Sequence, residues 1–458
     1  NDELRKAAQN NYLHNVVIDE AHIVVDWGVK FRPEFQILSI VLKELRELAN
    51  IDKKITTEEI VKAINSIGFE VEDVFKFNFV ENIKFGHVLK TYPNPESEKL
   101  TVCEIKFADK IRIIQTAAKN VKSNDYVMAF IPGSKLNGNE IQSKKMANIT
   151  SEGMLISYPE LGFKSELLTK YMNENILILD KVDLNKDPID LFHLHDNIIE
   201  VSILSNRSDA QSYYSFAKEL SAYFHSKYIP IPEKKKEYIA SDISIKLDNE
   251  NFLNGMKVQI DEFNIDIQDI FLLLKSNIKI DDNKYINFAN LTLIYTGVSL
   301  RAFDCSKISN NISIKKEKDI WYLNDSKQNI SILGVDVLKE FLPSNNSQNV
   351  FFEFSQINEK IVRENSKNSK LVTYSSINNS RVISNGMILL AFNFINNYFS
   401  KTSQLINEID QTELNFKFDE EYINNYAGFD IREKTNYKKA LKSLEILDFK
   451  ISKNKISI

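Results

Sequence analysis

Between residues 94 and 163, short apolar runs alternate with glycine, asparagine, proline and serine at close spacing. Two of these apolar runs fall at residues 111–121 and 127–138, and turn-forming residues follow each of them. Short strands separated by tight turns are typical of a small antiparallel barrel. We therefore expect a compact β-barrel in this part of the chain.

Residues 55–74 carry a different pattern, with apolar positions at helical spacing followed by alternation. Thr56 and Glu59 form a capping box, which predicts the helix start. Gly68 predicts the helix end, because glycine adopts the left-handed conformation that closes helices. The apolar face of this helix is Ile60, Ala63, Ile64 and Ile67. A strand is expected over residues 69–74.

Residues 197–224 predict a strand, a turn and a long helix. Ser208 and Gln211 are expected to cap the helix. Arg207 and Asp209 precede it, and we expect them to stabilise the turn rather than to act in catalysis. The buried stripe of the helix is predicted to be Tyr213, Phe216, Ala217, Leu220 and Phe224.

The second half of the chain contains two further regions. Residues 243–405 alternate strands with a few helices, and their mixed periodicity indicates an α/β domain. In residues 416–458 one helix is expected to begin at Asp419 and to end at Gly428. A second helix is expected to begin at Asn436, and a hairpin to end the chain.

Composition limits the class of protein. The chain has 458 residues, 43% hydrophobic and 26% charged, which predicts a multidomain globular protein. Its net charge is −5, so any contact with nucleic acid must come from local basic patches. Cys103 and Cys305 form no metal-ligand spacing, and we expect a reducing cytoplasm. No run approaches the ~18 apolar residues of a membrane span.

The first residues differ from the rest. Residues 15–22 form an apolar run that ends in two carboxylates, Asp19 and Glu20, which is suited to holding Mg²⁺ beside a phosphate. This segment resembles the DEAH box of RecQ-like helicases. The chain lacks the GxxxxGK[ST] loop that such ATP hydrolysis requires. We therefore interpret it as a fragment, with a strand, a turn and a helix from Pro33 to about residue 49.

The barrel region contains five short motif blocks in a fixed order: Pro95, Glu98, Lys99, Leu100 and Cys103; Ala118, Asn120 and Val121; Pro132, Gly133 and Leu136; Ser151, Glu152, Gly153, Met154 and Leu155; Glu160, Leu161 and Gly162. In this order they resemble the tRNA-binding domain of the phenylalanyl-tRNA synthetase beta subunit. The resemblance implies an OB-fold that binds tRNA. The residues expected to contact tRNA are Lys99, Lys119, Asn120, Lys135, Lys144, Lys145 and Ser151.

Residues 243–405 resemble the editing domain of the same family, which hydrolyses tyrosine mischarged onto tRNA. The resemblance identifies Arg301, Glu353 and Thr373 as a remnant of its pocket. Arg301 stands where the family has a histidine, and Asp336 and Val337 replace a methionine and a glycine of its glycine-rich turn. These replacements predict a filled pocket and lost editing activity.

The expected partner of Arg301 follows from burial. A buried guanidinium requires a carboxylate, and the nearest candidates in sequence are Asp304 and Asp336. Glu353 and Thr373 are expected to remain able to accept or donate hydrogen bonds.

The resulting fold class is α+β multidomain, with the OB-fold barrel inserted in a small α/β domain. A mixed α/β editing-like domain and a small helical domain follow. The predicted boundaries are 1–48 for the helicase-like fragment, 49–82 with 164–232 for the N-terminal α+β domain, 83–163 for the barrel, 243–405 for the editing-like domain and 412–458 for the helical domain.

The family resemblance implies a C-terminally truncated beta subunit that binds tRNA for phenylalanine and supports a catalytic alpha subunit in an α2β2 heterotetramer. It implies ATP and Mg²⁺ for the whole synthetase, with none bound by this chain, no metal residue and no catalytic residue in it. Two alternatives stay open: a remnant ATP-dependent helicase and a stand-alone tRNA-binding protein.

Overall fold

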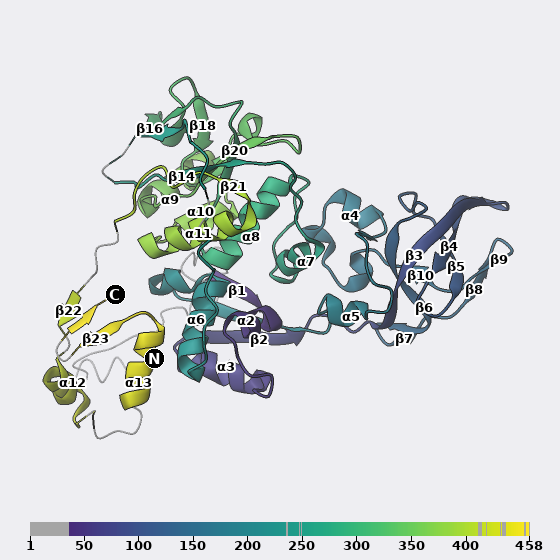
Figure 1. The fold of residues 1–458 in the computed structure, drawn as a ribbon, viewed down its shortest axis with the longest axis horizontal. Helices are drawn as coiled ribbons and strands as arrows, with labels where there is room; N and C mark the ends of the chain where they lie inside the picture. The colour runs from purple at the N-terminus through teal and green to yellow at the C-terminus, as the bar shows by residue number, and fades with distance from the viewer. Residues whose placement is uncertain are drawn as a thin grey trace, which may run out of the picture.

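The computed structural model describes residues 36–234, 237–246, 248, 250–410, 415–417, 419–430, 432, 437–452 and 455–457. Figure 1 shows a central α/β unit with a β-rich body at one end and a larger α/β body above it. A small unit formed by the last residues lies on the other side of the centre. None of the helices in these ranges has the length and apolar character needed to cross a bilayer.

The central unit is built on a three-stranded antiparallel sheet in the order β1-β12-β2. Its strands are β1 (Gln36–Val41), β12 (Asn197–Ile203) and β2 (Glu70–Lys76), and its helices are α2 (Leu42–Leu48), α3 (Thr57–Ser66) and α6 (Tyr213–Phe224). The capping box of α3 is confirmed, since Thr56 accepts from the Glu59 backbone and Glu59 accepts from the Thr56 backbone.

The predicted boundary at residue 48 does not fit this sheet. Residues 36–41 form a strand, β1, that pairs with β12 from Gln36 opposite Ile203 to Val41 opposite Ile198. The helix predicted from Pro33 is the short α2, which begins only at Leu42. The apolar run of β1 buries Ile40 and Val41 in the main core, so residues 36–48 belong to the central unit.

The turn before α6 holds the expected ion pair. Arg207 Nε and Nη2 donate to the two carboxylate oxygens of Asp209 at 3.1 and 2.9 Å. The helix itself is capped by Ser212, whose hydroxyl accepts from the Ser215 backbone at 3.2 Å. The prediction of Ser208 and Gln211 as caps was therefore wrong by a few residues, because the 205–210 segment forms a separate 3₁₀ turn.

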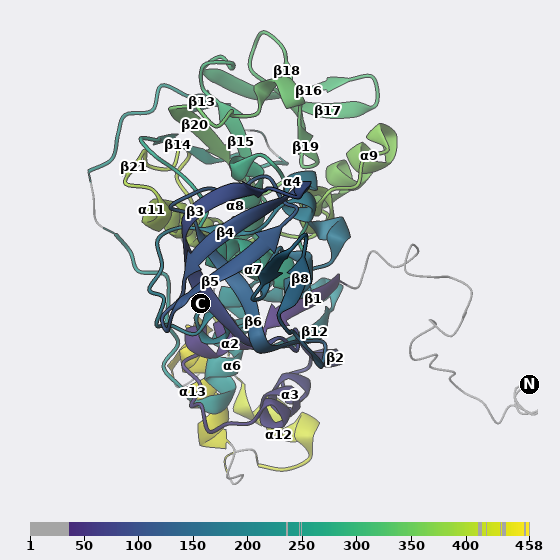
Figure 2. The same ribbon diagram turned by 90° about the vertical axis from the view of Figure 1, so that its right-hand side faces the viewer.

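The β-rich body is a seven-stranded antiparallel sheet with the path β10-β6-β3-β4-β5, to which β7 and β11 add beside β6. Its elements are β3 (Glu81–Asn94), β4 (Ser97–Lys106), β5 (Ile111–Thr116), β6 (Tyr126–Leu136), β7 (Asn139–Glu140), β10 (Met154–Leu155) and β11 (Ile178–Leu179). The Glu152 amide donates to the Ile113 carbonyl at 2.7 Å, which joins the two ends of the path. Figure 2 shows these strands facing the viewer.

The predicted end of this body at residue 163 is too early. β11 pairs with β6 through Ile178 and Val127. The intervening segment carries short helices at Pro159–Leu161, Ser165–Leu167 and α4 (Lys170–Glu174). A further short helix, α5 (Pro188–Leu191), leads back to β12.

The upper body contains two neighbouring sheets with helices beside them (Figure 1). The first sheet has the order β13-β16-β17-β18-β19, with β13 (Ser244–Ile245), β16 (Asn311–Glu317), β17 (Ile320–Asn324), β18 (Asn329–Ile332) and β19 (Asp336–Val337). The second has the order β15-β20-β14-β21, with β15 (Arg301–Asp304), β20 (Asn349–Glu353), β14 (Gly255–Gln259) and β21 (Lys401–Thr402). The helices are α7 (Ile267–Lys275), α8 (Lys284–Thr296), a 3₁₀ turn at Lys339–Phe341, α9 (Glu359–Ser369), α10 (Tyr374–Asn379) and α11 (Asn385–Tyr398).

The last unit has two helices, α12 (Glu420–Ala427) and α13 (Tyr437–Ile446), and a sheet in the order β22-β24-β23. Its strands are β22 (Asn415–Lys417), β23 (Lys450–Ser452) and β24 (Lys455–Ser457). Asp419 caps α12 and Gly428 ends it with φ +74°, as the sequence predicted. The predicted terminal hairpin is the β23–β24 pair.

Candidate nucleic-acid interface

The β8–β9 hairpin, formed by Lys144–Met146 and Ile149–Ser151, projects from the β-rich body. A buried amide network fixes its base. Gln115 Nε2 on β5 donates to the Met146 and Ile149 carbonyls at 3.0 and 2.9 Å. Asn94 Nδ2 donates to Gln115 Oε1 at 2.7 Å. Because buried amides bonded on several sides are costly to displace, the hairpin is held in one position.

Ser151 at the end of the hairpin and Gly153 just after it have roles that few other residue types could fill. Ser151 Oγ accepts from the Gln115 amide at 3.0 Å and donates to the Gly153 carbonyl at 2.9 Å. Gly153 has φ +141°, and a Cβ there would lie 2.2 Å from the Phe130 carbonyl oxygen. Only glycine fits this close approach of two strands. Ser151 and Gly153 therefore fix the path of the backbone behind the hairpin.

Lys144 and Lys145 lie on the first strand of this hairpin, and both are exposed. Lys99, at the start of β4, is also exposed. Within the residues that the structure describes, no ion pair joins any of these three ammonium groups to a carboxylate. Unpaired, solvated ammonium groups on a rigid support are suited to contacts with phosphates.

The other predicted contact residues make hydrogen bonds or ion pairs within the protein. Lys119 Nζ donates to the Lys99 carbonyl at 3.1 Å, and Lys135 forms an ion pair with Glu81 at 2.9 Å. Asn120 exchanges hydrogen bonds with the Ile176 backbone at 2.8 and 3.2 Å. Ser151 is 1% exposed. The side chains of Asn120 and Ser151 are thus occupied in positioning backbone.

A groove of about 640 Å³ runs beside the hairpin. Lys144 and Met146 form one side, Leu100 and Thr116 contribute the sheet side, and residues 173–176 close the far end. None of the residues that line it is aromatic. Base stacking has no aromatic platform here, and Glu140, Glu160 and Glu174 outnumber Lys144 in the lining. Phosphates would therefore contact the exposed hairpin lysines rather than the floor of the groove.

The remnant pocket of the upper body is organised by a buried ion pair. Arg301 on β15 lies directly opposite Glu353 on β20, and both side chains are almost fully buried. Arg301 Nη2 donates to Glu353 Oε1 at 2.8 Å, and Arg301 Nε donates to the other carboxylate oxygen. Ser355 Oγ also donates to Glu353. Both carboxylate oxygens of Glu353 are therefore bonded to Arg301.

This pairing corrects the expected partner of Arg301. The partner of Arg301 is Glu353 and not Asp304 or Asp336, because cross-strand register places it opposite. Asp304 instead accepts from Ser306 Oγ at 2.7 Å and from Ser347 Oγ at 2.5 Å. Glu353 does accept hydrogen bonds, as expected, and its donors are Arg301 and Ser355 of the protein itself.

A cavity of about 280 Å³ remains beside the pair, lined in part by Arg301, Asp336, Val337 and Thr373. Burial raises the pKa of Asp336, and Arg301 opposes that rise. Val337 lies in the extended strand β19, so the turn expected for a glycine pair is replaced by sheet. Thr373 caps α10 and donates to the Val335 carbonyl at 2.7 Å.

The remaining predicted residues add no site. Asp19 and Glu20 lie outside the described residues. Among the residues that the structure does describe, no group of three or more His, Cys, Asp and Glu side chains is arranged to hold a metal ion. The amide network of Asn94 and Gln115 was not predicted, since neither residue type carries a distinctive signal; the Asn94–Pro95 turn was the only hint in the sequence.

Comparison with known proteins agrees with this geometry. A family model described as a putative tRNA binding domain matches residues 83–176, which span most of the β-rich body. The phenylalanine–tRNA ligase beta subunit of Mycoplasmopsis pulmonis is 38% identical over 431 residues, covering 91% of this chain and 60% of that protein. The beta subunit of Mycoplasma mobile is 40% identical over 444 residues, covering 91% of this chain and 59% of that protein.

Among solved structures, an N-terminal fragment of the phenylalanyl-tRNA synthetase beta subunit from Pyrococcus horikoshii is 15% identical. It covers 61% of this chain and 83% of that chain, and its TM-score of 0.30 does not establish a shared fold. The chain spans about three-fifths of the length of the two curated relatives. These relatives favour the synthetase prediction over the helicase and stand-alone alternatives. Over nine-tenths of its length, the chain is similar to phenylalanine–tRNA ligase beta subunits.

Proposed function

We propose that this chain is the tRNA-binding and supporting part of the beta subunit of phenylalanine–tRNA ligase. The observation that carries the proposal is the rigid hairpin with exposed Lys144 and Lys145, set in the region that matches the tRNA-binding model. The whole synthetase would pair this subunit with a catalytic alpha subunit as α2β2, use ATP and Mg²⁺, and act in the cytoplasm. The β-rich body is interpreted as an OB-fold, and this chain alone is expected to form no phenylalanyl-tRNA.

Binding of tRNA by the hairpin has a direct test. Because each neutralised phosphate contributes roughly −0.7 to −0.9 to the slope of log K against log salt, Lys144→Ala with Lys145→Ala should reduce that slope by about one to two and weaken binding. Affinity for tRNA is measured by filter binding between about 50 and 200 mM salt.

The matched control is Lys315→Ala with Lys316→Ala, an adjacent lysine pair on β16 in the upper body. This variant has the same change in net charge and should keep the parent slope. Equal losses in the two double variants would assign the binding to overall charge and would contradict a site on the hairpin.

We also propose that editing is lost. Hydrolysis of a mischarged tyrosyl ester needs room for the substrate and polar groups free to orient water. Here Glu353 is paired with Arg301, and Thr373 is occupied as a helix cap. We expect tyrosyl-tRNA to survive incubation with the chain as long as it does in buffer.

The measurement is the release of labelled tyrosine over time, with Glu353→Ala as the companion variant. Release clearly above the buffer rate that disappears in Glu353→Ala would show an active pocket. Release that persists in this variant would point to a contaminating hydrolase and would leave the pocket inactive.

A further inference from the structure

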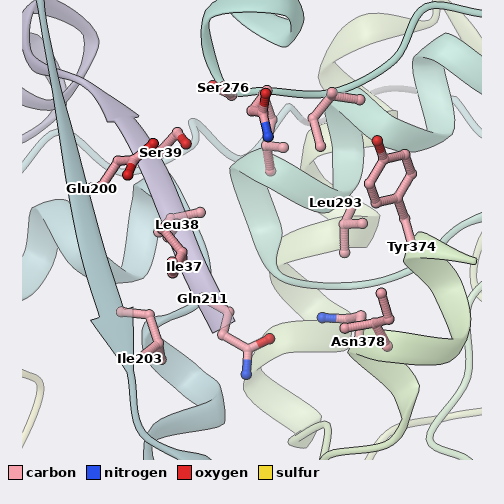
Figure 3. A pocket seen from close by; sticks show the side chains of 14 residues that line it. Ile37, Leu38, Ser39, Glu200, Ile203, Gln211, Ser276, Leu293, Tyr374 and Asn378 are labelled. Atoms are coloured by element: carbon pink, nitrogen blue, oxygen red, sulfur yellow. The ribbon is translucent and has the colours of Figure 1, made fainter. Parts of the chain in front are cut away.

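A second cavity, of about 340 Å³, lies where the central sheet meets the helices of the upper body. Figure 3 shows β1 and β12 on one side, with Leu293 of α8 and Tyr374 and Asn378 of α10 on the other. In the sheet order β1-β12-β2, β1 is an outer strand, and the cavity borders it. The cavity shares only Tyr374 with the cavity beside Arg301, and it shares no lining residue with the groove beside the hairpin.

The walls of this cavity are mostly apolar. The apolar lining residues are Ile37, Leu38, Ile203, Ile278, Leu293, Ile294 and Ile377. Cavities of roughly 300–1,000 Å³ with such walls and a few polar groups are typical sites for small molecules. The volume therefore admits a body about the size of one or two fused rings.

Several polar lining groups are satisfied by the protein. Asn378 Nδ2 donates to the Gly297 carbonyl at 2.9 Å, and its Oδ1 accepts from Ser299 Oγ at 3.0 Å. Ser276 Oγ and the Tyr213 hydroxyl share a hydrogen bond of 3.0 Å. A bound molecule gains little from these groups, because a hydrogen bond to them would replace one already made.

Glu200 and Ser39 differ from these polar groups in their hydrogen bonding. They lie opposite each other on β12 and β1, and Figure 3 shows both side chains at the same end of the cavity. Glu200 is the one charged side chain among the 14 that line it. Within the described residues, neither its carboxylate nor the Ser39 hydroxyl has a hydrogen-bond or ion-pair partner.

A second carboxylate close to Glu200 also favours a cation at this end of the cavity. Asp73 on β2 is the other cross-strand neighbour of Glu200, on the edge of β12 away from β1. Two like charges opposite each other on adjacent strands repel, so a cation bound beside Glu200 would relieve that repulsion. The carboxylate selects a cationic group, and the apolar walls select the body that carries it.

We propose that this cavity binds a small molecule with an apolar, ring-sized body and a protonated amine. The amine donates to the Glu200 carboxylate and the Ser39 hydroxyl, and the body packs against Leu293, Ile294 and Ile377. Because the site joins the central unit to α8 and α10, binding also stabilises that junction. The proposal is independent of tRNA binding.

The test uses three probes of one size with different charge: tryptamine, indole and indole-3-acetate. Binding to the full chain is measured by isothermal titration, together with the shift of the thermal unfolding midpoint. We expect tryptamine to bind more tightly than indole, and indole-3-acetate to bind least. Tryptamine should raise the unfolding midpoint, because a ligand that binds only the folded state stabilises it.

Two variants locate the site. Glu200→Gln keeps the shape and removes the charge, so tryptamine affinity should fall about tenfold, to that of indole. Ile377→Trp, at a position that is 39% exposed, should fill the mouth of the cavity and abolish binding of both probes. The control Glu70→Gln removes an exposed carboxylate from the same sheet, outside the cavity, and should leave every affinity unchanged.

Equal affinity for tryptamine and indole-3-acetate would overturn the proposal, as would the absence of tryptamine binding at millimolar concentration. Unchanged tryptamine binding in Glu200→Gln would also overturn it. If Ile377→Trp fails to fold by circular dichroism, the charge series in the parent chain and in Glu200→Gln decides the question alone.

Discussion

Lys275, the last residue of α7, is a deeply buried lysine where this helix packs against the central unit. It is 7% exposed, and its Nζ donates to the Phe192 and His193 carbonyls, both at 2.9 Å. Burial lowers the pKa of Lys275 to about 8, while Asp196 opposes that shift. Burial, together with Lys43 and Lys275, lowers the pKa of His193 to about 4. Lys275 therefore lies in a site that disfavours its charged form.

The shift of Lys275 gives stability a defined pH dependence. Between its folded pKa of about 8 and the ordinary lysine pKa of 10.5, the unfolded chain binds a proton that the folded chain lacks. Raising the pH through this window therefore stabilises the folded state, by on the order of 3 kcal/mol at most. In Lys275→Met this gain should be absent, so the difference in stability between parent and variant should change with pH.

The measurement is urea unfolding at several pH values across the window. Lys401→Met, at a lysine that pairs with Asp261 at 2.9 Å on the surface, is the control and should follow the parent. The same pH dependence in the parent and in Lys275→Met would show that Lys275 does not titrate in this range.

At the scale of elements, the sequence predicted those whose signals are local. The ends of α3 depend on Thr56, Glu59 and Gly68, all within the helix or next to it, and the structure has them as expected. The same holds for α12, which begins after Asp419 and ends at Gly428. Caps and turn glycines act through the nearest backbone groups, so short sequence patterns identify them.

Elements that depend on distant partners were predicted less well. Residues 36–41 become a strand because β12, more than 150 residues later, pairs with them. Arg301 finds Glu353, 52 residues away, through the register of β15 with β20. Register between strands is set by the packing of whole sheets. Periodicity along one segment could not identify either partner.

In the candidate sites too, local features were predicted from the sequence and pairings between distant residues were not. Exposed lysines at turns were found from the sequence, because a charged residue beside turn residues is almost always solvated. The structure then separates Lys144 and Lys145, which are unpaired within the described residues, from Lys135, which pairs with Glu81. Ion pairs of this kind depend on side chains from two strands, so sequence spacing alone cannot separate paired lysines from unpaired ones.

At the scale of the molecule, one hydrophobic core joins three parts. It combines residues of the central sheet with Phe85 and Phe130 of the β-rich body and with Phe271 and Leu274 of α7. Strands β3 and β6 therefore bury both faces, one inside the β-rich body and one against the centre. The arrangement in Figure 1 is held by shared packing, so the β-rich body is not joined by a linker alone.

Phe271 occupies the centre of this junction. It is 1% exposed, and its ring lies 4.9 Å from Phe163, 5.1 Å from Phe192 and 6.0 Å from Tyr158, measured between ring centroids. Removing the ring in Phe271→Ala loses these contacts and leaves a cavity that the surrounding side chains fill only in part. We expect a loss of about 3–5 kcal/mol in the free energy of unfolding, measured with urea.

Hydrogen exchange distinguishes a lost junction from general destabilisation. In Phe271→Ala, amides of residues 158–168 and 188–194 should exchange faster than those of the upper body, because these segments meet at the missing ring. The control is Phe303→Ala, which removes a fully buried ring from the separate core of the upper body. It should cost a similar free energy yet speed exchange in β15 and β20 instead. Uniform acceleration in both variants would mean that the chain unfolds as one cooperative unit and that Phe271 has no special role in joining its parts.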